Sequence, residues 1–192
     1  MPDRSDSELI RASVEGSEEA FSFLVDRYRR PLFSVVVRMV RDPTIAEDLC
    51  QEAFVKAHRA LATFDTKRKF SSWLFKIGHN TTIDYLRKFK PPTQPLETDD
   101  DDRRSLSETL IDEATLSPDL GVVGSEIGEA LERCLRELRP KYSEALVLRF
   151  VEGLSYQEIA DVTGDALGTV KTNIHRARKE LARLMEDQGW TP

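Results

Sequence analysis

The sequence predicts an all-α protein, with two small helical domains at residues 1–90 and 126–188 joined by an acidic flexible linker at residues 91–125. In the first block apolar residues recur at helical spacing and no strand pattern is convincing, and the second block has the pattern of four helices. The segment between them is rich in Pro, Asp, Ser and Thr and lacks a sustained apolar period, which is the composition of a linker. A length of 192 residues suits one ordinary domain or two small ones.

The first block contains several signals for the start of a helix. Ser17 precedes a helical pattern and can cap it. Pro31 and Pro43 both stand where a new helix can begin, because proline is tolerated in the first helical turn. A long amphipathic helix is predicted from Thr44 to about Phe64.

A further helix closes the first block. Ser71 or Ser72 can cap its start, and it is predicted to run to about Phe89. The Pro91-Pro92 pair stops it, because the residue before a proline is pushed out of the helical conformation.

The second block begins with two helices. The first carries an apolar stripe at helical spacing, formed by Ile127, Ala130, Leu131, Cys134, Leu135 and Leu138. Pro140 is predicted to start the second helix, and Gly153 to end it.

A short helix, a turn that contains glycine and a long helix then follow, which is the pattern of a helix-turn-helix. Ser155 opens the short helix in a capping box with Glu158, and this helix is predicted to end near Val162. Residues 163–165 form a tight turn. The long helix is predicted from about residue 166 to about residue 186.

The long helix has two contrasting faces. A narrow apolar stripe is formed by Leu167, Val170, Ile174, Ala177, Leu181 and Leu184. The opposite face carries Thr172, His175, Arg176, Lys179 and Arg183, flanked by Lys171 and Asn173. Residues 166–183 hold five cations and one anion, and Lys, Arg, Asn and Thr are side chains that contact phosphates and base edges. The polar face is therefore a candidate DNA-binding surface; the alternative is a solvated face of a helical bundle.

Charge is distributed unevenly along the chain. The formal net charge is −6, yet residues 56–90 hold nine cations and two anions, whereas residues 91–127 hold two cations and ten anions. A local field matters more to a polyanion than the total, because salt screens charges beyond about 10 Å. The acidic total therefore does not exclude nucleic acid as a partner.

The basic stretch is interleaved with aromatic residues: Phe64, Phe70, Trp73, Phe75, Tyr85 and Phe89. Cationic tracks with aromatic faces bind unstacked bases. Asn80 falls seven residues after Trp73, on the same helix face. Four of the apolar residues in this stretch are expected by default to lie in the core: Leu74, Phe75, Ile77 and Tyr85. Phe64 and Phe70 flank a charged loop and are harder to bury, so a single-strand site and a structural role are both open for that loop.

Several classes of protein are not indicated. No apolar run approaches the roughly 20 residues that span a bilayer, and the N-terminal residues lack a signal-peptide core. Cys50 and Cys134 are expected to be buried free thiols. His58, His79 and His175 have no neighbouring ligand cluster, so we predict no metal site. No nucleophile–base pairing or phosphate loop is present, so we predict neither an enzyme nor a cofactor.

Three segments carry a family resemblance: AEDLCQEAFVKAHRALATF (46–64), FSSWLFKIGHNTTIDYLRK (70–88) and residues 138–181. Together they resemble the bacterial RNA polymerase sigma factors of the extracytoplasmic-function (ECF) class. The first is similar to the family's core-binding helix, the second to the segment that opens and reads the −10 promoter element, and the third to region 4, which reads the −35 element. Their order across a polar linker, with no further domain between them, is typical of this class.

The resemblance implies roles for three groups of residues. The first group would face the coiled coil of the polymerase's largest subunit: Asp48, Leu49, Gln51, Glu52, Phe54 and Lys56. The second would form a loop that captures a flipped-out base of the non-template strand: Phe64, Asp65, Lys67, Arg68, Lys69 and Phe70, with Asn80 lining the pocket and Trp73 at a partly structural position. The third would contact the −35 element: Ser155, Thr169, Lys171, Thr172, Asn173, His175 and Arg176, with Arg178 and Lys179 on phosphates.

The resemblance also implies the partners. These are the RNA polymerase core, through its largest-subunit coiled coil and its β flap, promoter DNA, and an anti-sigma factor that covers the polymerase-binding surfaces in a stress or envelope response. The protein would act in the cytoplasm, with the nucleoid when in holoenzyme or held at the membrane by an anti-sigma factor, without inserting. Lys171-Thr172-Asn173 stands where many relatives carry arginines, so the resemblance implies the docking mode and not the base preference.

Some alternatives stay open at this point. The acidic linker, with Asp99 to Asp102, either threads the RNA channel of the polymerase as a mimic of RNA charge or is a solvated spacer. The chain could also be a helical regulator that binds duplex DNA without polymerase, or a helical signalling adaptor with no DNA role.

Overall fold

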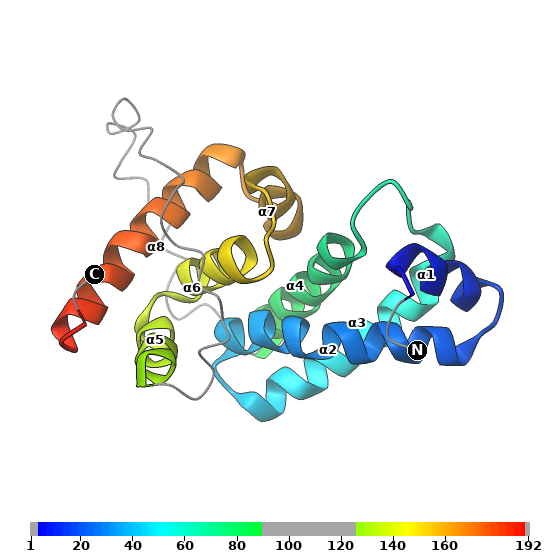
Figure 1. Ribbon diagram of the computed structural model, residues 1–192, viewed down its shortest axis with the longest axis horizontal. Helices are drawn as coiled ribbons and strands as arrows, with labels where there is room; N and C mark the ends of the chain where they lie inside the picture. The colour runs from blue at the N-terminus through cyan, green and yellow to red at the C-terminus, as the bar shows by residue number, and fades with distance from the viewer. Residues whose placement is uncertain (1–3, 90–125, 191–192) are drawn as a thin grey trace.

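A computed structural model describes residues 4–89 and 126–190, and the regular elements in both ranges are all helical (Figure 1). The elements of the first range are α1 (Asp6–Val14), α2 (Glu18–Val40), α3 (Pro43–Ala60), the 3₁₀ turn η1 (Leu61–Thr63) and α4 (Phe70–Phe89). Those of the second are α5 (Glu126–Glu137), α6 (Pro140–Leu146), the π-helical η3 (Val147–Val151), α7 (Tyr156–Thr163) and α8 (Leu167–Asp187). The predicted all-α class is confirmed. The predicted linker at residues 91–125 lies outside the described residues.

Most of the predicted helix starts are confirmed. The hydroxyl of Ser17 accepts a hydrogen bond from the Ala20 amide at the start of α2. Asp42 caps α3, with Pro43 in its first turn. The helix α1 was not predicted, although Ser5 and Glu8 form a capping box that is readable in the sequence as S-D-S-E.

The expectation that Pro31 starts a helix is wrong, because α2 runs through it from Glu18 to Val40. A proline inside a helix removes a hydrogen bond and costs about 3 kcal/mol. Burial along the same helix offsets this cost, since Leu24, Leu32 and Val35 are fully buried. Tertiary packing therefore keeps α2 helical through Pro31, although the local preference of proline opposes a helix there.

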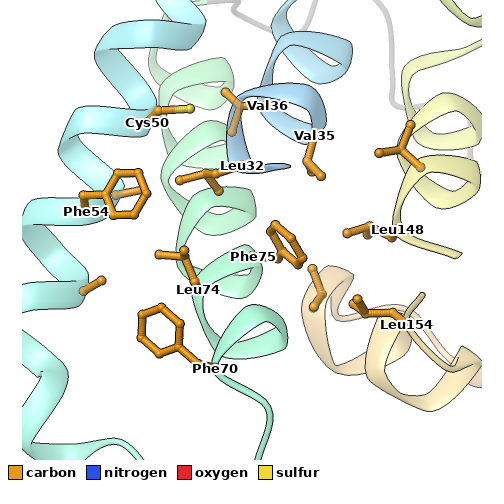
Figure 2. Close-up of a cluster of buried hydrophobic side chains, with 14 of the residues drawn as sticks. Leu32, Val35, Val36, Cys50, Phe54, Phe70, Leu74, Phe75, Leu148 and Leu154 are labelled. Carbon is orange, nitrogen blue, oxygen red and sulfur yellow. The ribbon is translucent and has the colours of Figure 1, made fainter. Parts of the chain in front are cut away.

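One hydrophobic core joins the two blocks (Figure 2). Phe75 of α4 is fully buried and lies between Val35 of α2 and Leu148 and Leu154 of the second block. The helices α6 and α7 accordingly pack beside α2 and α4 (Figure 1). A second, smaller cluster lies within the C-terminal block and is formed by Leu135, Leu138, Tyr142, Leu146 and Ala177.

The helix α4 begins at Phe70, ahead of the predicted start at Ser71 or Ser72, and reaches Phe89 as predicted. It approaches α2 closely at Gly78, where an added Cβ would lie 2.5 Å from the Cδ1 atom of Leu32. A glycine at this position lets the two helices pack with the Leu32 side chain between them. The close approach holds α4 against α2, and both helices contact the second block.

Candidate nucleic-acid and protein interfaces

The predicted helix-turn-helix is present as α7, a turn and α8. The Ser155 amide donates to the Glu158 carboxylate at 2.7 Å, and the Glu158 amide donates to the Ser155 hydroxyl at 3.2 Å, so the capping box is confirmed. Gly164 ends α7 with φ +77°, a left-handed conformation that favours glycine. These local signals set the position of α8, whose first residue is Leu167.

The outer face of α8 is largely as expected. The buried side is formed by Val170, Ile174 and Ala177. Three polar groups of the other side are exposed at helical spacing, namely Lys171, His175 and Lys179, and Thr169 is exposed in the first turn. The partly exposed members are Thr172, Arg176 and Arg178.

The expectation that Asn173 lies on this exposed face is wrong, since its side chain is 7% exposed. The reason is helical rotation. Asn173 lies three residues after Val170 and four before Ala177, so it shares their buried face.

The loop between η1 and α4 combines exposed cations with buried rings. Lys67, Arg68 and Lys69 are exposed, and the Lys67 amide donates to the Asp65 carboxylate at 3.0 Å. Phe64 and Phe70, expected to resist burial, are only 9% and 3% exposed. The expectation that these two rings lie at the surface is therefore wrong in this conformation.

An aromatic cluster explains why both rings are buried. The Phe70 ring lies 5.3 Å from that of Tyr28, 5.8 Å from Phe64 and 5.7 Å from Trp73 in centroid distance. The Phe64 and Trp73 centroids are 5.1 Å apart. Rings at such distances and tilts stabilise each other beyond their burial. Trp73 is half-buried and packs behind the loop, consistent with the structural part of its expected role.

We expect Phe70→Ala to lower the free energy of unfolding by about 3–5 kcal/mol, because it leaves a cavity among three other rings. Urea denaturation measures this directly. Phe89→Ala is the matched control on the same helix, since Phe89 is 60% exposed, and should cost less than about 1 kcal/mol. Equal losses for the two variants would mean that Phe70 is not buried in solution.

A cavity of about 320 Å³ lies beside this loop. Phe64, Phe70 and Tyr28 supply its aromatic walls, and Arg68 and Lys69 lie at its cationic side. Asn80, which was expected to line the pocket, is exposed on α4 and is not among the lining residues.

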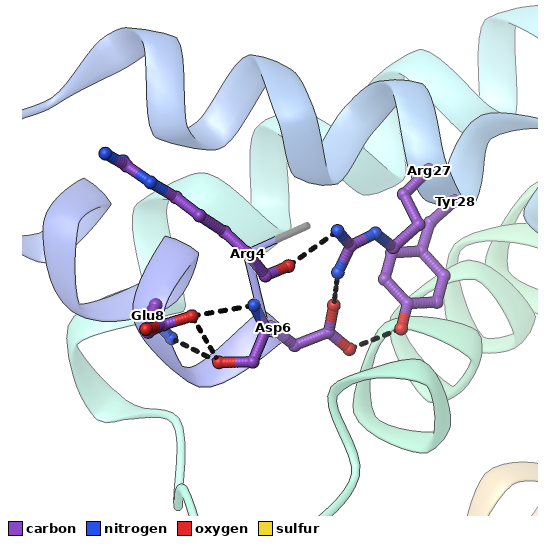
Figure 3. Close-up of polar contacts among 6 residues, drawn as sticks. Arg4, Asp6, Glu8, Arg27 and Tyr28 are labelled. Atoms are coloured by element: carbon purple, nitrogen blue, oxygen red, sulfur yellow. Dashed lines mark hydrogen bonds and ion pairs between the residues drawn. The ribbon is translucent and has the colours of Figure 1, made fainter. Parts of the chain in front are cut away.

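The helix α1 forms another wall of the cavity and is fastened to α2 (Figure 3). The Asp6 carboxylate accepts from the Arg27 guanidinium and from the Tyr28 hydroxyl, and Arg27 also donates to the Arg4 carbonyl at 2.8 Å. Burial raises the pKa of Tyr28, and its hydrogen bond to Asp6 raises it further. The phenol therefore stays protonated and holds α1 in place.

One face of α3 is polar and exposed. Asp48, Gln51 and Glu52 are exposed on it, as expected, and the Lys56 ammonium lies 2.8 Å from Glu52 and 3.1 Å from the Thr81 hydroxyl. The other two residues of the predicted group are buried, Leu49 at 4% and Phe54 at 8% exposure, so they anchor α3 to the core.

A groove between α2 and α3 was not predicted from the sequence. Its volume is about 490 Å³, and its lining includes Arg29, Arg30 and Phe33 of α2 with Gln51 and Phe54 of α3. The arginine doublet was the available signal. The exposed face of α3 therefore continues into a groove that has both cationic and apolar lining.

Both cysteines are free and buried, as predicted. Burial raises the pKa of Cys50 to about 12, so this thiol is not a reactive thiolate at neutral pH. Residues 4–89 and 126–190 contain no group of three or more potential ligands placed to hold a metal ion. Within the same ranges, no helix combines the length and hydropathy needed to cross a bilayer.

Two segments of the chain match two regions of one protein family. Residues 24–90 match Sigma-70 region 2, and residues 128–181 match Sigma-70, region 4. It is 34% identical to the ECF RNA polymerase sigma factor SigW of Bacillus subtilis, over 93% of this chain and 95% of SigW. It is 32% identical to the RNA polymerase sigma-H factor of Pseudomonas aeruginosa, over 97% and 96% of the two chains.

The fold is also similar to solved structures. The sigma factor RpoE of Bartonella quintana, in a co-crystal with the anti-sigma factor NepR, gives a TM-score of 0.61 with 25% identity, over 86% of this chain and 96% of that one. CnrH, in complex with the cytosolic domain of CnrY, gives 0.60 with 27% identity, over 95% and 97%.

Proposed function

The chain belongs to the extracytoplasmic-function sigma factors of the sigma-70 family, which direct RNA polymerase to specific promoters, and we propose how its surfaces divide that task. Residues 1–90 form the unit that binds the polymerase core and melts the −10 element. Residues 126–188 form the unit that reads the −35 element. The chain performs no chemistry of its own, and the polymerase supplies the catalysis.

The polymerase surface is the exposed face of α3. Asp48, Gln51 and Glu52 project from it and would meet the coiled coil of the largest subunit, with Lys56 at the edge. The groove that begins at Gln51 and includes Arg29 extends this surface onto α2. Exposed charges that complement a partner determine specificity and association rate more than affinity.

The −10 surface is the loop at residues 64–70 with its cavity. The exposed cations Lys67, Arg68 and Lys69 would follow the backbone of the displaced strand. A base that leaves the stack loses a few kcal/mol, and stacking on an aromatic wall returns about 1–3 kcal/mol. Phe64 and Phe70 supply such walls beside the cavity.

The −35 surface is the outer face of α8. The second helix of a helix-turn-helix enters the major groove with its N-terminal residues on the bases. Thr169, Lys171 and His175 are exposed at this end and would contact bases, and Lys179 would contact phosphate. Ser155, at the exposed start of α7, would hold the adjacent backbone.

Regulation by an anti-sigma factor is supported by the structure that is similar to this chain and contains NepR. In the cytoplasm such a partner would cover the α3 surface until a stress or envelope signal releases it. The two DNA-reading units are each of limited affinity, and the polymerase would add their contacts by holding both at a fixed separation.

Two observations support this proposal: the family membership and the exposed basic face of α8. Run-off transcription with core polymerase on a library of genomic promoter fragments tests it. We expect discrete transcripts only when both the chain and the core are present. Duplex binding by the chain alone, with no transcripts in the presence of core, would instead support a DNA-binding regulator that does not use polymerase.

A further inference from the structure

The helix α1 forms a wall of the cavity beside the loop at residues 64–70, although it lies outside residues 24–90, which match Sigma-70 region 2. Three residues of α1 line the cavity: Asp6, Ser7 and Ile10. Ile10 is 4% exposed and belongs to the hydrophobic core, so it anchors the helix. The polar side chains that α1 brings to the cavity therefore have a fixed place, and the proposed function gives them no role.

Two donors from α2 hold the Asp6 carboxylate in position (Figure 3). Its Oδ1 atom accepts a hydrogen bond from the Arg27 guanidinium, and its Oδ2 atom accepts one from the Tyr28 hydroxyl. Burial raises the pKa of the Tyr28 phenol, so the hydroxyl keeps its proton at neutral pH and remains a donor. Each oxygen of Asp6 thus has its own partner, and the carboxylate cannot turn without losing one of them.

The Asp6 carboxylate can accept further hydrogen bonds. A carboxylate offers about four acceptor positions on its two oxygens, and Arg27 and Tyr28 use one position each. The Asp6 side chain is 28% exposed and lines the cavity. Its unused acceptor positions are therefore accessible to a donor that enters the cavity.

The loop supplies donors to the same cavity. Arg68 and Lys69 line it, and their side chains are 58% and 60% exposed. Each also pairs with a carboxylate of α7, Arg68 with Asp161 at 2.9 Å and Lys69 with Glu158 at 3.0 Å. Exposed pairs of this kind contribute little free energy, so a ligand can compete for both cations. The cavity thus offers an acceptor from α1 and donors from the loop.

This arrangement of acceptor and donors distinguishes two classes of base. Adenine and cytosine present an amino donor beside an unprotonated ring nitrogen, whereas guanine and thymine present a carbonyl oxygen in place of the amino group. A base that leaves the stack is recognised along this edge. A carboxylate accepts from the amino group, but it repels a carbonyl oxygen. The aromatic walls of the cavity do not discriminate, because every base has a face that stacks.

We propose that Asp6 is a specificity-determining residue of the −10 site, and that its carboxylate selects a captured adenine or cytosine by accepting a hydrogen bond from the amino group of the base. The inference rests on the proposed function of the loop and its cavity. It extends the −10 site from region 2 to α1. Arg27 and Tyr28 are then positioning residues, because they act on the base through Asp6.

Deleting the amino group from the DNA tests the proposal with the native chain in holoenzyme. The probe is a labelled single-stranded oligonucleotide with the non-template −10 sequence of a promoter found by run-off transcription, so its affinity contains no cost of melting. Fluorescence anisotropy measures the affinity, and a scan of abasic positions locates the captured base as the position of largest loss. Replacing adenine there by unsubstituted purine, or cytosine by 2-pyrimidinone, should weaken binding by about ten-fold or more.

Three variants connect this loss to Asp6. In Asp6→Asn an acceptor oxygen becomes a donor, so deletion of the amino group should cost about two-fold or less, and the preference over thymine should disappear. Tyr28→Phe keeps the ring but leaves Asp6 to Arg27 alone, so its loss should be intermediate. Glu15→Gln is the matched control, an exposed carboxylate at the other end of α1, and should retain the full loss. Circular dichroism and affinity for core polymerase should match the wild type in all three.

Two results would overturn the inference alone. One is a captured position at which thymine or guanine binds as tightly as adenine or cytosine. The other is an equal loss on deletion of the amino group in Asp6→Asn and in the wild type. Holoenzyme that binds none of the oligonucleotides would instead remove the −10 surface from the proposed function, and this inference with it. The base substitutions require no variant, so they decide the amino preference even where Asp6→Asn fails to fold.

Discussion

Reversing the charge of Asp48 and Glu52 to arginine should weaken binding to core RNA polymerase by roughly 30-fold or more, the equivalent of about 2–5 kcal/mol. Both side chains are exposed on α3, so the change would remove the proposed contacts with the partner and leave the core of the chain intact. Among residues 4–89 and 126–190 the change removes the pairing of Glu52 with Lys56, one helical turn away, worth about 0.5 kcal/mol. Fluorescence anisotropy of a labelled chain titrated with core polymerase measures the affinity.

The control for this variant is Glu186→Arg, an exposed carboxylate near the end of α8. It reverses one carboxylate, half the change of charge of the double variant, at a position far along the chain from α3, and it should bind core polymerase like the wild type. Equal weakening in Glu186→Arg would show that net charge, and not the α3 face, determines the affinity. Wild-type binding by the α3 variant would remove the polymerase surface from the proposal.

Replacing Lys171 and His175 by alanine should reduce transcription from a promoter with a −35 element by roughly ten-fold or more, because each base contact is worth about 1–3 kcal/mol. Both side chains are exposed near the N-terminal end of α8, which would enter the groove first in the proposed docking mode. Lys179→Ala should behave differently, since a phosphate contact carries no sequence information. It should weaken binding to all promoters alike and reduce the slope of log affinity against log salt by about one.

Arg183→Ala provides the positional control on the same helix. Arg183 is exposed and pairs with Asp187 at 3.1 Å, farther from the N-terminal end. Its effect on transcription should be small. An effect as large as that of the Lys171 and His175 variant would mean that α8 binds DNA through its positive charge alone.

Helix ends were predictable where the signal is local. Ser17, Pro43 and the Ser155–Glu158 capping box all begin helices as predicted, because a cap is decided by residues within one turn. The prediction that a helix begins at Pro31 was wrong because the outcome there is not local. The packing of α2 on several distant helices keeps the helix continuous.

The placement of single side chains was less predictable. Phe70 follows three cations in sequence, and its burial depends in part on a contact with Tyr28, forty-two positions earlier. Whether Asn173 is buried or exposed depends on a rotation by one helical position, and it is buried. The polar faces of α3 and α8 were predictable, since a helical period assigns a whole face more reliably than one residue at its edge.

The contact between the two blocks could not be predicted from the sequence. Phe75, Leu148 and Leu154 each satisfy the apolar pattern of their own helix, and nothing in either pattern requires that they share one core. The same holds for the hydrogen-bonded side chains of His79 and Glu144, which are sixty-five positions apart.

Footprinting of a promoter complex tests the central claim most directly. With core polymerase bound, the chain should protect two patches of the promoter roughly 25 base pairs apart, and permanganate should oxidise unpaired thymines only at the downstream patch. The free chain should protect neither patch. A footprint of similar extent from the chain alone, or protection of both patches with no reactive thymines, would contradict the claim that this sigma factor reads and melts promoters only together with core polymerase.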